Sequence, residues 1–287
     1  METTMRDASW LEQPCIMGID EAGRGPVLGA MVYACAFCPE AKEESLKKKG
    51  FADSKVLKAG EREALFQEIV ADPDMEFNYD KISAKQISTS MLESTPVSLN
   101  ALAVNSTFKI ISQVLEKGVN IKKVFVDTLG DPATHQGRLS NNFPGIEFTV
   151  CPKADAIYPI VSAASIVAKV TRDADLAGIE KSMGFPPNSM GSGYPGDPDT
   201  VSFLKENIDS LFGYPELVRF SWSTCKSLLE ERGVKTKWEC DQEEDNSQQK
   251  LTCFAKRKAG CQIEMSSGVG RHTFFRVRRL QRVGAEF

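Results

Sequence analysis

An apolar run near the start of the 287-residue chain ends in two adjacent carboxylates and a glycine turn. The run, residues 15–19, is predicted to be a buried strand. It is followed by Asp20, Glu21 and the turn 23–25, Gly-Arg-Gly. Neighbouring strand residues point to opposite faces, so the two acids can share a metal ion only if the strand ends there. Because glycines accept unusual backbone angles, the turn is expected to supply that ending. The pattern indicates metal-assisted chemistry on a phosphate backbone; the alternative is an ordinary polar turn.

Two further acids stand beside predicted secondary structure. The strand expected at 124–127 ends in Asp127, which repeats the pattern of an apolar run delivering a carboxylate. Asp155 precedes a long helix with Pro159 in its first turn, where the helix dipole favours an anion. On its own, Asp155 could equally be an N-cap. Packing on the sheet explains the small residues of this helix better than chemistry does: Ala163, Ala164, Ser165 and Ala168.

Strand and helix patterns alternate along the chain, which predicts a mixed α/β domain. Further strands are expected at 27–37, 75–82 and 146–150, and helices at 61–71, 99–116, 199–208 and 221–231. Gly118 suits the position after the helix that ends at residue 116. The charged run 41–49 is expected to be a solvated segment.

The composition, 41% hydrophobic and 26% charged, is typical of a globular protein. There is no apolar run of membrane-spanning length and no signal peptide, so an intracellular protein is expected. The eight cysteines are scattered without zinc-site spacing, which favours buried thiols in a reducing compartment. The only histidines, His135 and His272, are interpreted as surface or structural residues. Their scarcity argues against catalytic triads and histidine-based zinc hydrolases.

Six motifs stand in order along the chain. They are DEAGRGPVLG at 20–29, ADSK at 52–55, VFVD at 124–127, KADAIYP at 153–159, SAASIVAKV at 162–170 and GSGYP at 191–195. Together they resemble the type 2 ribonuclease H family, also called ribonuclease HII, from about residue 14 to about residue 231. Further segments resemble most the catalytic subunit of the eukaryotic heterotrimeric complex: ISTSML at 87–92, FGYPELVRFSW at 212–222 and the region after 235.

This resemblance implies a ribonuclease-H-like mixed sheet flanked by helices, with a C-terminal helical extension. It implies an endonuclease that hydrolyses the RNA strand of RNA–DNA hybrids and cuts 5′ to single ribonucleotides in duplex DNA. The products would carry 5′-phosphate and 3′-hydroxyl ends, and the activity would serve ribonucleotide removal and RNA primer processing. Two magnesium or manganese ions, which prefer oxygen ligands, would be held by Asp20, Glu21, Asp127 and Asp155.

The resemblance also implies residues that recognise the substrate. Those expected to read the ribonucleotide 5′ to the cut and its junction with DNA are Gly23, Arg24, Gly25 and Tyr194. Without the family, Tyr194 would be interpreted as a turn aromatic. Three more positions would line the substrate: Lys55, Asn100 and Arg172. Each of these, taken alone, would more often be a solvated or capping residue.

The resemblance, which begins near residue 14, and the polar composition after Arg232 together divide the chain into an N-terminal extension at 1–13, a catalytic domain at 14–232 with a helical C-terminal part, and a polar linker with a basic tail at 233–287. The net charge is −4, but residues 251–287 hold eight Lys or Arg and two Glu, so an acidic body carries a basic tail. The family resemblance implies that this tail docks on two non-catalytic subunits; disorder is the alternative. The family and its substrate also favour a nuclear address, with or without a cytoplasmic pool.

Two other functions stay open from the sequence. A related metal-dependent nuclease could direct the same acids at DNA. An assembly or nucleic-acid-binding subunit could carry them in an idle site, although the presence of all four acids argues against that.

Overall fold

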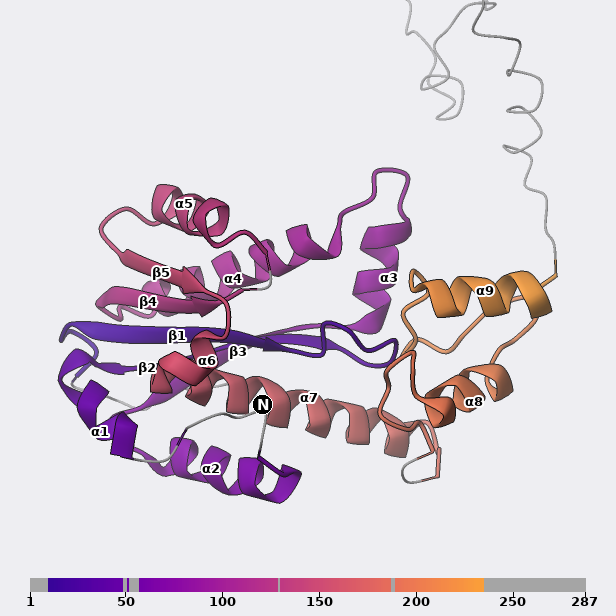
Figure 1. The fold of residues 1–287 in the computed structure, drawn as a ribbon, viewed down its shortest axis with the longest axis horizontal. Helices are drawn as coiled ribbons and strands as arrows, with labels where there is room; N and C mark the ends of the chain where they lie inside the picture. Colours follow the sequence, from indigo (N-terminus) through magenta and orange to yellow (C-terminus); the bar gives the residue numbers. More distant parts are fainter. Residues whose placement is uncertain (1–9, 49–50, 52–56, 129, 187–188, 235–287) are drawn as a thin grey trace, which may run out of the picture. The chain divides into compact units, whose positions relative to one another are not determined.

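The structure, a computed structural model, describes residues 10–48, 51, 57–128, 130–186 and 189–234 (Figure 1). Its centre is a five-stranded sheet in the order β3-β2-β1-β4-β5. The strands are β1 (Cys15–Ala22), β2 (Met31–Pro39), β3 (Glu76–Ile82), β4 (Ile121–Asp127) and β5 (Glu147–Cys151). The first three pair antiparallel, whereas β4 and β5 run parallel to β1 and to each other. This mixed sheet confirms the predicted α/β fold class.

The strand predicted at 27–37 starts later than expected, at Met31. The backbone N–H groups of Val27 and Leu28 both donate to the carbonyl of Gly193, at 2.8 and 3.3 Å. Residues 27–28 therefore pair with a distant loop instead of extending the ladder of β2. The same bonds tie the turn after β1 to the loop that carries Tyr194.

One face of the sheet is covered by α4 (Leu99–Glu116) and α5 (Pro132–Asn142), with α3 (Ala84–Leu92) beside α4 (Figure 1). The helix predicted at 99–116 is confirmed, and Gly118 follows it with a φ of 83°. Neither α3 nor α5 was predicted. Leu139 is the one buried residue of α5, so its sequence lacks an apolar stripe.

The opposite face is covered by α7 (Pro159–Ser182), with α1 (Glu43–Lys48) and α2 (Ala59–Ala71) below it (Figure 1). A Cβ placed on Gly18 of β1 would lie 2.4 Å from the carbonyl carbon of Ile160, so α7 approaches the sheet at backbone distance. The packing role of the alanines is confirmed, because Ala163, Ala164 and Ala168 are fully buried.

Most described side chains of the charged run 41–49 are exposed, as expected of a solvated segment, but the run is partly helical, which was not predicted. It forms a 3-10 turn, η1 (Glu40–Lys42), and α1. The reason is Leu46, which is 2% exposed and packs into the same core as α7. One buried leucine within a run of lysines and glutamates is too weak a signal to show an amphipathic helix in the sequence.

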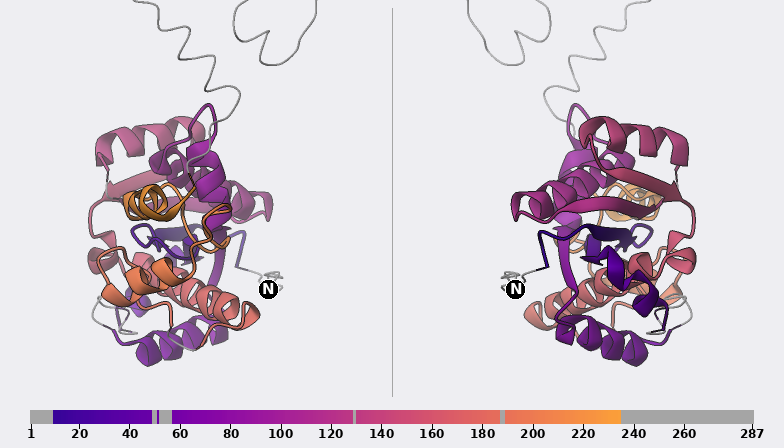
Figure 2. Two further views of the ribbon diagram at one scale, coloured as in Figure 1. Left: turned by 90° about the vertical axis from the view of Figure 1, so that its right-hand side faces the viewer. Right: turned by 90° about the vertical axis from the view of Figure 1, so that its left-hand side faces the viewer.

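The helices predicted at 199–208 and 221–231 are α8 (Pro198–Glu206) and α9 (Ser223–Arg232). Figure 2 shows them at one end of the sheet, where they surround a third apolar cluster. This cluster includes Val27 and Leu28, and a β-bridge joins Leu28 to Val218. The C-terminal helices are thus attached directly to the turn that follows β1.

Within the part of the chain that the structure describes, no helix is long and apolar enough to cross a membrane. The described cysteines are free thiols, mostly buried, as expected: Cys15, Cys35, Cys38, Cys151 and Cys225. The ADSK motif with Lys55, His272 and the tail 235–287 lie outside the described residues. The domain boundaries therefore stay predictions.

Candidate active site

Asp20 and Glu21 lie within β1, which continues through both acids to Ala22. The turn 23–25 ends the strand, as predicted, but one residue after the acids, because Glu21 and Ala22 still pair with Tyr33 and Val32 of β2. Side chains alternate along a strand. Asp20 therefore faces α7, where Ser165 hydrogen-bonds its carboxylate. Glu21 faces the opposite side, the one covered by α4.

Asp127 and Asp155 lie on the same side as Asp20. β1 and β4 run parallel with Ile19 opposite Val126, so the next residues, Asp20 and Asp127, stand side by side. Asp127 is the last residue of β4, and its Oδ1 accepts a hydrogen bond of 3.0 Å from the backbone N–H of Ala154. That residue begins α6 (Ala154–Ile157), in which Asp155 is 2% exposed. Asp155 is not an N-cap, since Tyr158 occupies that position of α7.

The environment of Asp20 disfavours its negative charge. The residue is 4% exposed, and its pKa is raised to about 7, mainly by this burial. The carboxylates of Asp127 and Asp155 contribute to the rise, whereas hydrogen bonds from Ser165 and the backbone of Glu21 oppose it. Three buried carboxylates in mutual repulsion are stabilised best by a cation between them.

A cavity of about 390 Å³ opens over these acids and brings opposite charges together. Its acidic lining includes Asp20, Glu21 and Asp127. Its basic lining comprises Arg24, Arg62, Lys169 and Arg172. Carboxylate oxygens beside a ring of cations suit a hard divalent metal ion and a phosphate group.

The donor set thus fits a divalent metal ion, although the acids are not gathered into one tight cluster. Among the described residues, no three His, Cys, Asp or Glu side chains form a group that could hold a metal ion. The alternation along β1 separates Glu21 from the face that Asp20 and Asp127 share.

The turn 23–25 is held from below by residues near the C-terminal end of the described chain. Arg219 is fully buried, and its guanidinium donates to the carbonyls of Gly29, Arg24 and Gly23 at 3.0, 3.1 and 2.5 Å. Burial lowers the pKa of Arg219 to about 9, which leaves it charged at neutral pH. Trp222 Nε1 donates to the carbonyl of Gly25 at 3.0 Å. Every carbonyl of this turn therefore has a fixed donor.

Two glycines of the turn leave room for neighbouring side chains. Gly23 has a φ of 79°, and a Cβ on it would lie 2.7 Å from the side chain of Arg172. A Cβ on Gly25 would lie 3.2 Å from the ring of Tyr194. The side chains of Arg172 and Tyr194 thus pack closely against the turn. Nε and Nη2 of Arg172 are buried and have no hydrogen-bond partner within the described ranges.

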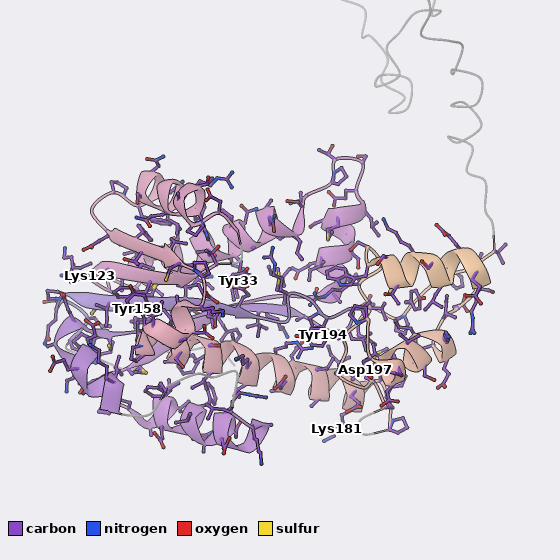
Figure 3. All side chains as sticks on the ribbon, in the orientation of Figure 1. Tyr33, Lys123, Tyr158, Lys181, Tyr194 and Asp197 are labelled. Carbon is purple, nitrogen blue, oxygen red and sulfur yellow. The ribbon has the colours of Figure 1, made fainter. Side chains whose placement is uncertain are left out.

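Tyr194 is half-exposed, on a loop that Asp197 holds in shape (Figure 3). The Asp197 carboxylate accepts hydrogen bonds from the backbone and hydroxyl of Ser192, both at 2.6 Å. These bonds, with further ones from Asp199 and Thr200, lower the pKa of Asp197 to about 2. Tyr194 is therefore carried by an anchored loop and lines the same cavity as the acids.

A second cavity, of about 200 Å³, lies on the other side of Glu21. Its lining includes Asp127, Arg24 and Asn100, and Arg24 Nη2 donates a hydrogen bond to Asn100 Oδ1. His135 also lines it, half-buried. The interpretation of His135 as a surface or structural residue stays a prediction, although the unpredicted helix α5 brings it beside the site.

The structure brings most of the predicted site residues to these two neighbouring cavities. Those in the described ranges are Asp20, Glu21, Gly23, Arg24, Gly25, Asn100, Asp127, Arg172 and Tyr194. Asp155 is buried and is not among the residues that line them. Sequence reasoning missed several contributors: Tyr33, Arg62, Ser165, Lys169, Arg219 and Trp222. Ser165 in particular was assigned to packing alone, but its hydroxyl hydrogen-bonds Asp20.

Buried acids on neighbouring strands of a mixed sheet, under a cavity lined with arginine and lysine, define a nuclease of the ribonuclease-H-like class. The comparisons agree. The sequence matches the profile of the family Ribonuclease HII over residues 17–225. It is 43% identical over 295 residues to a ribonuclease H2 subunit of Arabidopsis thaliana, with 99% of each chain covered. The corresponding human ribonuclease H2 subunit is 43% identical over 275 residues, covering 94% of this chain and 90% of the relative.

A solved structure supports the same assignment. The crystal structure of the ribonuclease H2 from Pyrococcus horikoshii OT3 is 32% identical in sequence, with a TM-score of 0.64. The similarity covers 76% of this chain and 98% of that one. The chain belongs to the ribonuclease HII family. It is a metal-dependent ribonuclease H of type 2, a class that cleaves the RNA strand of RNA–DNA hybrids.

Proposed function

We propose that this enzyme, besides cleaving hybrids, cuts duplex DNA on the 5′ side of a single embedded ribonucleotide. The observation that carries the proposal is the turn 23–25, whose carbonyls are fixed by Arg219 and Trp222 beside the buried acids. A 2′-hydroxyl is the feature that distinguishes RNA from DNA at one position. A rigid turn of backbone groups next to the acids is suited to recognise that hydroxyl.

Tyr194 supports recognition of the neighbouring nucleotide. Its ring is half-exposed, packs against Gly25 and lies on a loop fixed by Asp197. An aromatic face on an anchored loop can stack against a sugar or base, and such stacking does not depend on sequence. The turn and Tyr194 would then read the ribonucleotide and its junction with DNA from adjacent positions.

The cations of the larger cavity would bind the backbone of the substrate. Arg172 has two buried donor nitrogens without a partner in the described part of the chain, and a phosphate oxygen would satisfy them. Asn100 would contact the substrate from the second cavity, beside Arg24. Lys55 is retained as a substrate contact on the strength of its motif alone.

For catalysis, we propose that Asp20, Glu21, Asp127 and Asp155 hold two magnesium or manganese ions. The support is the burial of three of these carboxylates and their mutual effect on the pKa of Asp20. When bound, the ions would supply an activated water and stabilise the leaving 3′ oxygen, so that the products are 5′-phosphate and 3′-hydroxyl. Ser165 would keep Asp20 oriented through its hydrogen bond.

We also propose that the chain works within a complex, because its relatives are named as subunits of ribonuclease H2. An exposed apolar group at the C-terminal end of the described chain supports a protein interface there: Leu211 at 62%, Phe212 at 81% and Val234 at 60% exposure. Asp209 Oδ1 accepts from the backbone of Leu211 and Phe212, both at 2.8 Å, so an ordered turn presents them to solvent. The tail 235–287 would also serve assembly, on the strength of the family resemblance alone, and a nuclear location would place the enzyme with its substrate.

The test is cleavage of a labelled DNA duplex with one ribonucleotide, with magnesium, by the full chain alone and with its co-purified partners. Asp20→Asn should lower the rate by more than about 100-fold, since even indirect loss of a metal contact costs about 10–100-fold. Asp74→Asn is the matched control, because Asp74 pairs with Lys42 away from both cavities. Cleavage of an all-DNA duplex would favour a different nuclease. Binding without cleavage of any substrate would favour an idle subunit.

A further inference from the structure

Tyr33 is a buried tyrosine of β2 that faces the candidate site. It pairs directly with Glu21 across the antiparallel strands, so the two side chains lie on the same face of the sheet. The residue is 5% exposed, and Figure 3 shows where it lies in the sheet. It lines the smaller cavity together with Glu21, Arg24 and Asn100. A phenol at this depth is expected to have a hydrogen-bond partner.

That partner is Arg24, the arginine of the turn 23–25. The side chains of Tyr33 and Arg24 are hydrogen-bonded. A guanidinium can only donate, so the phenol oxygen is the acceptor. Arg24 also donates to Asn100 Oδ1, and its own carbonyl accepts from Arg219. The backbone of Arg24 is thus fixed from below, and its guanidinium is held between a strand residue and a helix residue.

Burial first, and then the negative charge of Glu21, raise the pKa of the Tyr33 phenol above its ordinary value. Tyr33 thus lies beside both Glu21, its partner across the two strands, and Arg24, with which it lines the smaller cavity.

We propose that Tyr33 is a positioning residue that orients the guanidinium of Arg24 for substrate recognition. This role rests on the proposed function of the turn in reading the ribonucleotide. Without the phenol oxygen, Arg24 keeps Asn100 as a partner but loses the contact that fixes its second side. The guanidinium is then drawn towards the carboxylate of Glu21, which lines the same cavity and carries the opposite charge.

The substitution Tyr33→Phe isolates this contact, because it keeps the ring and removes one oxygen. A hydrogen bond to a charged group corresponds to about a tenfold effect or more, so kcat/KM should fall by about tenfold. The loss should appear mainly in KM, since Arg24 recognises the substrate and does not hold the acids together. The matched control is Tyr214→Phe. Tyr214 is 7% exposed, and its hydroxyl has no partner among the described residues, so this change should leave kcat/KM unchanged.

The decisive experiment is a double-mutant cycle in the full chain with its co-purified partners. Cleavage is measured for Tyr33→Phe, Arg24→Gln and the double variant, on the single-ribonucleotide duplex and on an RNA–DNA hybrid. If Tyr33 acts through Arg24, the double variant should match Arg24→Gln within about twofold.

Two results would overturn the proposal: an unchanged kcat/KM for Tyr33→Phe, or a tenfold loss that persists in the Arg24→Gln background. Failure of the proposed function is distinguishable. It would appear as a wild-type enzyme that cuts the hybrid but leaves the single-ribonucleotide duplex intact, and the cycle would then be read on the hybrid.

Discussion

The guanidinium of Arg219 lies over the indole ring of Trp222, 4.9 Å from its centroid. Both side chains donate to backbone carbonyls of the turn after β1: Arg219 to three and Trp222 to one. The stacked pair therefore works as one platform, and it fixes a turn almost 200 positions earlier in the chain. A buried arginine with all its bonds directed at carbonyls is specific to guanidinium geometry, which lysine does not share.

Arg219→Lys should therefore destabilise the protein although it keeps the charge. An ammonium cannot reach all three carbonyls from one position, so at least one buried acceptor loses its donor. The expected loss in the free energy of unfolding is about 2–4 kcal/mol. Urea unfolding would measure it. Arg232→Lys is the control, because Arg232, at the exposed end of α9, donates to a single carbonyl, that of Lys205. The effect of this change on the free energy of unfolding should stay below about 1 kcal/mol. Equal losses of unfolding free energy for the two changes would contradict the role of Arg219 in fixing the turn after β1.

The carboxylate of Asp197 should affect activity through the loop of Tyr194. Asp197→Asn removes the charge that orders the backbone and hydroxyl of Ser192. Cleavage at a single ribonucleotide should fall by about fivefold or more, in line with one charge-assisted hydrogen bond. Asp199→Asn is the control, because Asp199 contributes only its backbone N–H to this network. An unchanged rate for Asp197→Asn would mean that the loop does not need this anchor.

The pH dependence of this effect follows from the direction of the pKa shift. The pKa of Asp197 is lowered from an ordinary value of 3.8 to about 2, so its contribution is complete above the ordinary value and is lost as the pH falls towards 2. The ratio of wild-type to Asp197→Asn rates should therefore be constant from about pH 6 to about pH 9. A ratio that changes within this range would show that another group controls the loop.

The sequence predicts the centre of the sheet well because β1 and β2 are buried on both faces and read as apolar runs. Helices that bury much of their surface, such as α4 and α7, are also predicted. The misses, α1, α3 and α5, bury only one or two residues each in the core, so their apolar patterns are weak. The helix α2 also buries a single residue, Ile69, but it was predicted because Leu65 and Phe66 pack beside it at helical spacing. What marks a helix in the sequence is the spacing of its apolar residues.

The residues of the site also fall into two groups, those that the sequence shows and those that only the structure shows. The acids are visible in the sequence because each stands beside a strand or helix end. Arg219, Tyr33 and Trp222 are not, since a buried arginine and an exposed one look identical in composition. Their roles come from contacts across most of the chain, with 190 positions between Arg219 and Gly29. The sequence also fails to show that β1 continues past its acids, because that depends on pairing with β2.

Gly18, the one glycine within the five strands of the sheet, should not tolerate replacement by alanine. Gly18→Ala places a methyl group 2.4 Å from backbone atoms of Ile160, so α7 must move away from β1 and from Asp20. The expected loss is about 2–4 kcal/mol of unfolding free energy, typical of overpacking against a rigid backbone. Thermal melting would detect it.

Gly178→Ala is the matched control for that prediction. Gly178 lies on the exposed side of α7, and a Cβ there meets nothing within 4 Å. Alanine in a helix is favoured over glycine by about 0.5–1 kcal/mol, so this change should raise the melting temperature slightly. Opposite signs for the same chemical change would show that the approach of α7 to the sheet, and not helix propensity, decides the result at Gly18.

Phe212 offers the sharpest test of the proposed protein interface. At 81% exposure it contributes little to the core, so Phe212→Ser should change the unfolding free energy by less than about 0.5 kcal/mol. If partner subunits cover it, the same change should weaken complex formation by about tenfold or more, as loss of an aromatic anchor does. Titration of the purified partners against the full chain would measure this. Met183→Ser, at an exposed methionine on the end of α7, should leave assembly unchanged. Unaltered assembly of Phe212→Ser would move the interface away from this turn and leave the tail as its main determinant.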